Sequence, residues 1–409
     1  MTWGNEKPPR RSLKGRILLA GLFSGLVFSS FLVVLEVVLR TTHLFGARLS
    51  WVTNDPVLGW KTNPGRTYWF NQENDHPITG RINRHGWRDD DWPLEKPEGS
   101  IRVAVLGDSF VEAYQVESDR TSVELCQALL SSELGLSVEV MNFGRAGFSQ
   151  TEELIVLERE VLRFEPDLVI VFFLPENDIG DVARETAQDL RRSFFLLSPG
   201  GDLTLDDSFS RTREYRIRAL LDTVKNNSAL ISLLGERWNM VQIQRFEAAR
   251  SLQAREQADP AHALTASASL CTAHPEESYR RNYGLNKVLI RAMSDLCRQQ
   301  GVRFLLVTLN TRAYDPKVEQ ELQAVDSTFD PNFFEDDLRE FAKTLGIECL
   351  GLQRVFRQHV LDHGVPLLWA HWNYEGNRLV AETLARHLQP VLLELAGRRP
   401  RGAHQDRDS

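Results

Sequence analysis

Four polar residues stand just after apolar runs or just before a final helix, and their types suit chemistry at an acyl carbon. Ser109 follows the apolar run 101–106 and offers a hydroxyl nucleophile. The segment after a second run holds the glycines Gly144 and Gly147, and a glycine backbone N–H there can approach an oxyanion without a side chain in the way. Asn177 follows a third run and offers a side-chain amide, while His371 offers an imidazole base. We therefore predict catalysis by Ser109 and His371, with an oxyanion hole of Ser109, Gly147 and Asn177.

The segments around these residues alternate between strand and helix patterns. Nearly continuous apolar runs suit parallel strands that are buried on both faces. Alternation of such runs with helical periodicity predicts a doubly wound α/β sheet, and the carboxyl edge of such a sheet is where ligands bind. We expect strands at 101–106, 138–142, 168–174, 302–309 and 347–350, and helices at 122–134, 152–164, 279–300, 336–345 and 376–395.

The order of the four residues resembles the SGNH family of GDSL-type hydrolases, over roughly residues 101–395. Each residue that names the family has a match in the chain: Ser109, Gly147, Asn177 and His371. The resemblance implies a flavodoxin-like three-layer α/β/α sandwich with a parallel sheet. It also implies hydrolysis or transfer of acyl esters, with no metal and no organic cofactor. The lead-in sequence 83–88 resembles the membrane-bound bacterial members.

One departure from the family pattern concerns the acid that orients the histidine. The family usually carries an aspartate two or three residues before it, where this chain has Trp369 and Leu368. A backbone carbonyl, or one of the acids Asp362, Glu375 and Glu176, is expected to hold the imidazole, unless the enzyme works as a dyad. Loss of a triad acid can lower the rate by orders of magnitude.

The N-terminal region predicts a single membrane anchor. Residues 17–35 carry no charge, and the apolar run extends to residue 39 past Glu36, which is long enough to cross a bilayer. Five basic residues precede it against one acid, so residues 1–16 are expected in the cytoplasm and the rest outside. We predict a single-pass protein of the bacterial inner (cell) membrane. A cleaved signal peptide is the alternative.

The remaining chain divides by composition. We expect an extracytoplasmic lead-in at 41–100, a hydrolase domain at 101–395 with a helical cap inserted at 180–277, and a disordered tail at 396–409. A net charge of −8 argues against nucleic acid as a partner. The predicted partner is an acylated glycan or lipid of the cell envelope, and an O-acetyl ester is the first expectation.

Several residues admit a second interpretation. Cys271 and Cys297 are candidates for a disulfide if the domain lies in an oxidising compartment. Asp178 and Asp181 could bind a cation, although two carboxylates are too few for calcium and a solvated loop is expected. His85 and His363 are rivals to His371 as the base, with surface roles as the default.

Two other functions use the same residues. An O-acyltransferase would share the chemistry and differ only in its acceptor. A catalytically silent envelope-assembly or glycan-binding protein would keep the fold alone. An α/β-hydrolase is disfavoured because no Gly-x-Ser-x-Gly occurs in the chain.

Overall fold

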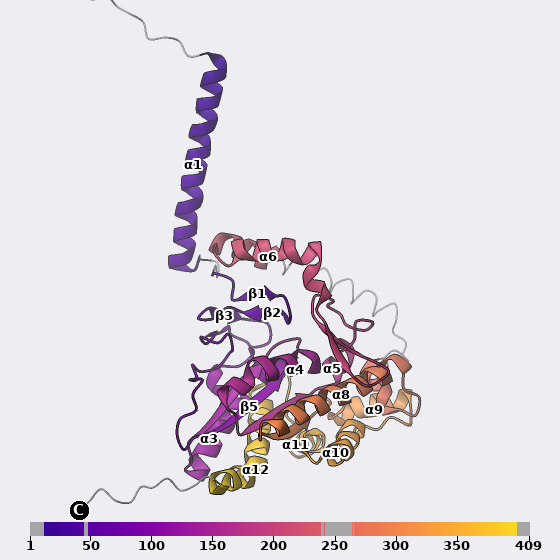
Figure 1. Ribbon diagram of the computed structural model, residues 1–409. Helices are drawn as coiled ribbons and strands as arrows, with labels where there is room; N and C mark the ends of the chain where they lie inside the picture. Colours follow the sequence, from indigo (N-terminus) through magenta and orange to yellow (C-terminus); the bar gives the residue numbers. More distant parts are fainter. Residues whose placement is uncertain (1–11, 45–47, 239–240, 242–263, 265, 399–409) are drawn as a thin grey trace, which may run out of the picture. The chain divides into compact units, whose positions relative to one another are not determined.

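The computed structural model describes residues 12–44, 48–238, 241, 264 and 266–398 (Figure 1). The chain forms two compact units, one of residues 1–50 with 220–249 and one of residues 51–219 with 250–409. Most of the expected cytoplasmic segment and of the expected disordered tail lies outside the described residues.

The larger unit is built on a five-stranded sheet whose neighbouring strands are all parallel. The strand order is β11-β10-β7-β5-β6. In chain order this is the 2-1-3-4-5 arrangement of flavodoxin-like folds, as predicted. The strands are β5 (Ile101–Gly107), β6 (Val138–Gly144), β7 (Leu168–Phe173), β10 (Arg303–Thr308) and β11 (Glu348–Gly351).

Each face of the sheet is covered by helices, which makes three layers (Figure 1). Every residue of β5 and β7 is buried, because alternate side chains point to opposite faces of the sheet and each face packs against its own hydrophobic core. Ala104 packs with α4 (Gln150–Arg159), α8 (Glu277–Gln299) and α10 (Phe333–Leu345). Val103 packs on the other face with α3 (Ser122–Leu134), α11 (Gln353–His363) and α12 (Tyr374–Arg398). The predicted three-layer fold is confirmed.

Local signals place the helix ends within a few residues of the expected positions. The helix expected at 152–164 is divided into α4 and a 3-10 turn at Val161–Phe164. It starts earlier than predicted because Ser149 caps it and forms a capping box with Glu152. Shorter helices follow three strands: α2 (Ser109–Glu112) after β5, α5 (Pro175–Asp181) after β7, and α9 (Pro316–Val325) after β10.

The lead-in before the sheet forms two antiparallel hairpins of four-residue strands. β1 (Val52–Asp55) pairs with β2 (Gly59–Thr62), and β3 (Thr67–Phe70) pairs with β4 (Ile78–Arg81). After these hairpins the buried Arg88 donates hydrogen bonds to the carbonyls of Glu112, Ala113 and Val116, at 2.7, 2.7 and 2.5 Å. The lead-in is therefore attached to the C-terminal end of α2.

The segment expected to be a helical cap also contains a hairpin. β8 (Phe194–Leu197) pairs with β9 (Leu203–Asp206), ahead of α6 (Arg213–Lys225) and a helix at 229–238. The Pro199-Gly200-Gly201 sequence between the strands is a turn signal that the sequence analysis did not use. Residues 239–240, 242–263 and 265 of the segment lie outside the described residues.

The four cysteines are free, so the disulfide between Cys271 and Cys297 that the sequence allowed is not formed. Both thiols are buried in the core beneath the α8 side of the sheet rather than in polar surroundings. Burial raises the pKa of the Cys297 thiol to about 12, which makes it unreactive.

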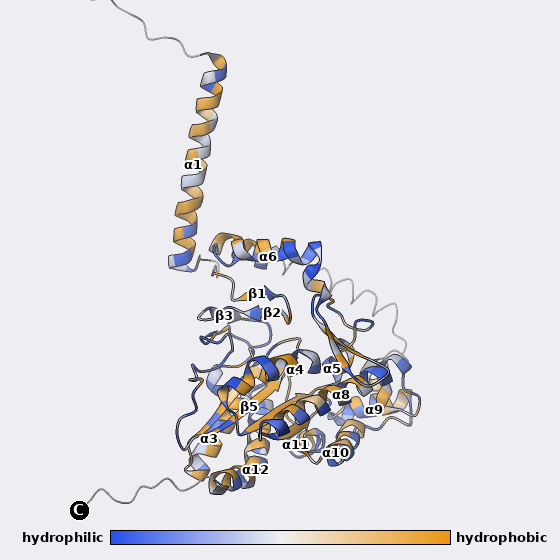
Figure 2. Cartoon of the chain, viewed as in Figure 1, coloured by the Kyte–Doolittle hydropathy of each residue, from blue (hydrophilic) through white to orange (hydrophobic). Residues whose placement is uncertain are grey.

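Among the described residues one helix, α1 (Leu13–Thr42), is long and apolar enough to cross a membrane. It has 30 residues, and the side chains of its apolar stretch are exposed. The orange along α1 in Figure 2 marks its hydrophobic residues.

Candidate active site

Ser109 and His371 lie in hydrogen-bond contact although 262 residues separate them in the chain. The distance between Ser109 Oγ and His371 Nε2 is 2.8 Å. Ser109 is the first residue of α2, directly after the carboxyl end of β5, and His371 precedes α12. The geometry of a nucleophile and its general base is present.

The Glu73 carboxylate lies on the other side of the imidazole. Its Oε1 is 2.6 Å from His371 Nδ1, and its Oε2 accepts the backbone N–H of His371 at 2.8 Å and of Ala370 at 3.2 Å. Because Nδ1 must donate to a carboxylate, Nε2 is left as the acceptor that faces the Ser109 hydroxyl. Glu73 belongs to the loop between β3 and β4, in the lead-in.

The prediction that Asp362, Glu375 or Glu176 orients His371 is therefore wrong. Asp362 accepts a hydrogen bond from Gln358 at 2.7 Å. Glu375 pairs with the guanidinium of Arg378, and Glu176 is held at the first turn of α5. No aspartate precedes His371 at the usual spacing because the lead-in supplies the acid from outside the sheet domain.

Glu73 and His371 shift each other's pKa. Burial disfavours the charged form of Glu73, but the hydrogen bond and charge of His371 outweigh it and lower the pKa of the carboxyl. Burial likewise opposes the imidazolium, yet the hydrogen bond and charge of Glu73 raise the pKa of His371. A positive imidazole is thus stabilised, as a base that takes a proton during reaction requires.

Asp108 shapes the turn that presents Ser109. It caps α2, where its Oδ1 accepts the backbone N–H of Phe110 at 2.9 Å. Its Oδ2 accepts the side-chain amide of Asn177 at 2.5 Å. Burial raises the pKa of Asp108. Asn177, at the start of α5, is therefore held beside the residue before the nucleophile, close to where the sequence analysis placed it.

The loop that carries Gly147 lies against the same turn. The backbone N–H of Arg145 donates to the Gly107 carbonyl at 3.0 Å, and that of Ala146 donates to the Glu112 carboxylate at 2.7 Å. Gly147 has a φ of +71°, in the region that favours glycine, and its carbonyl accepts a hydrogen bond from Arg192.

A second glycine lets the nucleophile helix approach the sheet. A Cβ on Gly144, the last residue of β6, would lie 2.5 Å from the backbone nitrogen of Glu112 and 2.7 Å from Val111 Cβ. The close packing brings Glu112 under the Gly147 loop. There, burial raises the pKa of the Glu112 carboxyl to about 7.

An open cleft of about 850 Å³ adjoins His371. Its lining includes Phe110, Asn177, Leu368 and Trp369 together with His371. Trp369 is 40% exposed, whereas Trp372 is fully buried among aromatic rings beneath the site. Trp369 therefore lines the cleft, whereas Trp372 is a packing residue.

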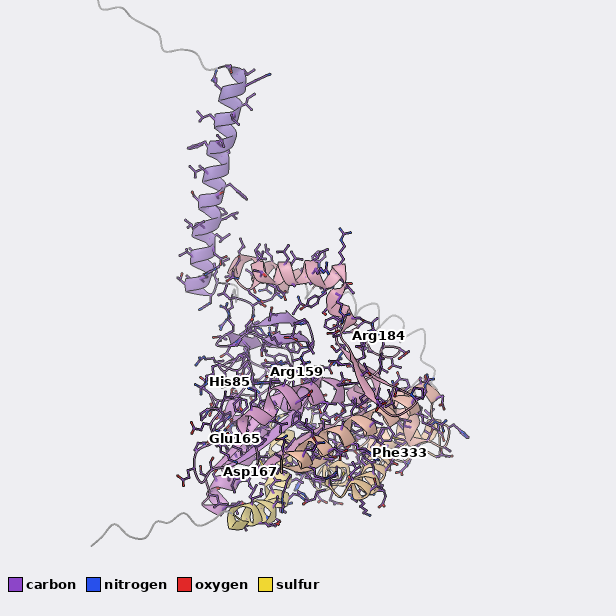
Figure 3. All side chains as sticks on the ribbon, viewed as in Figure 1. His85, Arg159, Glu165, Asp167, Arg184 and Phe333 are labelled. Atoms are coloured by element: carbon purple, nitrogen blue, oxygen red, sulfur yellow. The ribbon has the colours of Figure 1, made fainter. Side chains whose placement is uncertain are left out.

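The residues that admitted a second interpretation make hydrogen bonds, ion pairs and ring contacts with groups other than Ser109. His85, labelled in Figure 3, contacts the Trp92 carbonyl at 3.0 Å and the Phe164 ring. His363 stacks on His359 within α11. Asp178 accepts the Leu174 backbone N–H at 2.6 Å, and Asp181 pairs with Arg192 at 3.4 Å. Within the described residues no cluster of three metal-ligating side chains occurs.

Comparisons with known proteins found solved structures but no family model and no curated relative. The chain is similar to the structure of TesA at 13% identity, over 71% of this chain and 99% of that chain, with a TM-score of 0.34. It is similar to the acetyl xylan esterase AlAXEase at 14% identity, over 70% and 100%, with a TM-score of 0.37. A lipolytic protein of the G-D-S-L family from Desulfitobacterium hafniense matches at 14% identity, over 70% and 98%, with a TM-score of 0.32.

The roles of individual residues therefore rest on the geometry of this chain. Ser109, His371 and Asn177 are brought together, and the Gly147 loop packs beside them. Glu73 was missed because no spacing rule links residue 73 to residue 371. Its only signal was the polar, turn-rich composition of the lead-in.

Proposed function

We propose that this protein is a serine ester hydrolase in which Ser109, His371 and Glu73 form the catalytic triad. The observation that carries the proposal is the unbroken row of hydrogen bonds from Ser109 Oγ through the imidazole to the Glu73 carboxylate, at 2.8 and 2.6 Å. Such a row matches the nucleophile, base and orienting acid of acyl transfer.

The reaction follows from these positions. His371 Nε2 takes the hydroxyl proton as Ser109 Oγ attacks the ester carbonyl carbon, which becomes tetrahedral. The proton then passes from Nε2 to the departing alcohol oxygen, and the acyl group stays on Ser109. A water molecule, deprotonated by the same imidazole, releases the acid and restores the hydroxyl. Glu73 stabilises the imidazolium in both steps.

The tetrahedral oxyanion needs donors on the side of Ser109 away from His371. We assign this role to the backbone N–H groups of Ser109 and Gly147 and to the Asn177 amide. Asp108 fixes that amide by accepting one of its two N–H groups, which leaves the other for the substrate. One such donor contributes about 3 kcal/mol to the transition state.

The cleft indicates the kind of ester. Its 850 Å³ open onto the surface, and Trp369 offers a half-exposed indole beside the imidazole. Aromatic faces pack against the apolar faces of sugar rings. An O-acetyl group on an envelope glycan fits this site, and an acylated lipid is the second substrate class.

The location follows from α1. Its apolar residues 17–35 span about 28 Å at the helical rise, close to the thickness of a hydrocarbon core. With basic residues ahead of it, this helix anchors the protein in the bacterial inner membrane and leaves the site on the outer side.

The test is labelling and turnover with the full-length chain in detergent. A fluorophosphonate probe should modify wild type at Ser109, and an aryl acetate should release acetate. Ser109→Ala should abolish both, whereas the matched control Ser132→Ala, on the exposed face of α3, should abolish neither.

Two outcomes would redirect the proposal. Equal inertness of wild type and Ser109→Ala would favour the catalytically silent envelope protein. Acetyl transfer to an added oligosaccharide in preference to water would identify an O-acyltransferase, which uses the same acyl-enzyme.

A further inference from the structure

Two helical segments of the smaller unit, the part of α6 from residue 220 onward and the helix at 229–238, carry apolar side chains that are exposed. On α6, Leu220, Leu221 and Val224 are 69%, 60% and 48% exposed. On the helix at 229–238, Ile231, Leu234 and Trp238 are 40%, 57% and 62% exposed. Within each helix the spacing puts these residues on one face. We call these six residues the apolar face.

Contacts with α1 fix the start of the second helix. The Glu36 carboxylate accepts the backbone N–H of Ala229 at 2.7 Å, that of Leu230 at 3.0 Å, and the Ser228 hydroxyl at 2.9 Å. It therefore caps this helix, which satisfies N–H groups that a helix leaves free at its first turn. Arg40, paired with Glu36 at 2.6 Å, donates to the Asn227 carbonyl.

A small core stabilises the same contact. Leu39 and Ala229 are buried against each other, and four leucines pack around them: Leu35, Leu49, Leu230 and Leu233. The helix at 229–238 thus uses one face to contact α1. Its other face, with Ile231, Leu234 and Trp238, is left exposed, which is unusual for three large apolar side chains so close together.

The position of Glu36 along α1 indicates the surroundings of the apolar face. The uncharged stretch of α1 ends at residue 35, so Glu36 is the first charged residue after about 28 Å of apolar helix. A helix capped by Glu36 must therefore begin at the outer boundary of the hydrocarbon core. The same helix carries an exposed tryptophan, Trp238, the residue type that is enriched at membrane interfaces.

The charge of α6 agrees with a lipid surface. Arg213, Arg216, Arg218 and Lys225 outnumber its acids Glu214 and Asp222. Alternating basic and apolar positions are typical of helices that lie in the headgroup region of anionic membranes. Figure 2 shows the same alternation along α6.

We propose that α6 and the helix at 229–238 form an interfacial membrane-binding element, with the apolar face inserted into the outer surface of the bilayer that α1 crosses. This proposal rests on the membrane anchor proposed above and is independent of the esterase chemistry. The element gives the protein a second attachment beside α1.

The test measures the depth of single labels in the full-length chain, reconstituted in vesicles of zwitterionic and anionic phospholipid. A fluorophore is placed at Leu234→Cys or Leu221→Cys, with Ser29→Cys in α1 and Glu321→Cys on the exposed face of α9 as controls. Wild type treated with the same fluorophore gives the background from the native cysteines, three of which are buried. Bromine on the lipid chains quenches only fluorophores that enter the bilayer.

The expected result is quenching by brominated lipid at residues 29, 221 and 234, none at 321, and shallower depth at 221 and 234 than at 29. If brominated lipid quenches the label at 29, and only an aqueous quencher reaches the labels at 221 and 234, the interfacial element is contradicted. The membrane anchor is then still supported. Protection at 234 and 221 from both lipid and aqueous quenchers would mean that a protein covers the face, which also overturns it. No quenching at 29 would overturn anchor and element together.

Ester hydrolysis is measured with the same vesicles. Aryl acetate hydrolysis without lipid contact at 221 and 234 separates a failed element from a working enzyme. Lipid contact at both positions without hydrolysis supports the element and contradicts the proposed catalysis.

Discussion

The carboxylate of Glu73 lies 2.6 Å from Nδ1 of His371, across 298 residues of sequence. The same carboxylate accepts two backbone N–H groups of the histidine loop. One side chain from the lead-in thereby orients the imidazole and also fixes the backbone that carries it.

Glu73→Gln should lower kcat by about 10³ to 10⁴, because an amide can hold the ring in the wrong tautomer and cannot stabilise the imidazolium. Steady-state hydrolysis of an aryl acetate measures this change. Asp362→Asn, an exposed acid in α11 that the sequence also suggested, should leave kcat within a factor of about two, since surface substitutions have small effects. Equal losses in both variants would remove Glu73 from the triad.

The pH profile gives a second readout of the same contact. Glu73 raises the pKa of His371, so the acidic limb of kcat/KM, where the base becomes protonated, should lie above the ordinary pKa of about 6.5. In Glu73→Gln this limb should move to lower pH. A raised histidine pKa also means that the contact stabilises the fold below the unfolded pKa, and that this stabilisation is lost as pH rises through the folded value. An unmoved limb would contradict the assigned partner.

Gly144→Ala should destabilise the protein by about 1 to 3 kcal/mol, because the new Cβ meets the backbone nitrogen of Glu112 at 2.5 Å. It should also lower kcat, since α2 carries Ser109 and must shift. Chemical unfolding and ester hydrolysis measure the two effects. Gly284→Ala in α8 meets no atom within 4 Å and should instead be neutral or stabilising by about 0.5 to 1 kcal/mol. The proposed packing fails if both substitutions behave alike.

Trp369→Ala should raise KM for an acetylated oligosaccharide several-fold and leave hydrolysis of a small aryl acetate nearly unchanged, because the indole lines the cleft and not the reacting atoms. Trp372→Ala should instead lower the free energy of unfolding by about 3 to 5 kcal/mol, because that ring is fully buried. A Trp369 variant with equal losses on both esters would argue against a glycan subsite.

Arg88→Met should destabilise the fold by about 3 to 5 kcal/mol, because three carbonyls at the end of α2 lose their buried donor. Arg81→Ala, an exposed arginine whose nearest carboxylate is 3.7 Å away, should cost at most about 1 kcal/mol. Thermal unfolding of the two variants distinguishes these effects.

The sheet and most of its helices were predictable because the strands are short and mainly apolar, and β7 is entirely so. Ser109 and His371 were predictable because each stands at an element boundary, where parallel strands bring polar residues to a common edge. The β8–β9 hairpin was missed, since its apolar residues form two runs too short to stand out beside the helical segments around them.

Glu73 could not be predicted, because a hairpin loop has no periodicity that points at a distant residue. The sequence left the state of Cys271 open for a related reason. Its neighbours are partly polar, but the packing of its segment against α5, α8 and α10 buries the thiol. Long-range contacts of this kind depend on the whole fold.

The origin of Glu73 in the lead-in sets the order in which the machinery is completed during synthesis. The acid leaves the ribosome first, the nucleophile follows, and the base comes last. If the proposed triad is correct, a nascent chain cannot cleave esters before residue 371 has been made and folded. Proteolytic removal of the lead-in would take away both the carboxylate that contacts His371 and the Arg88 contacts with the end of α2.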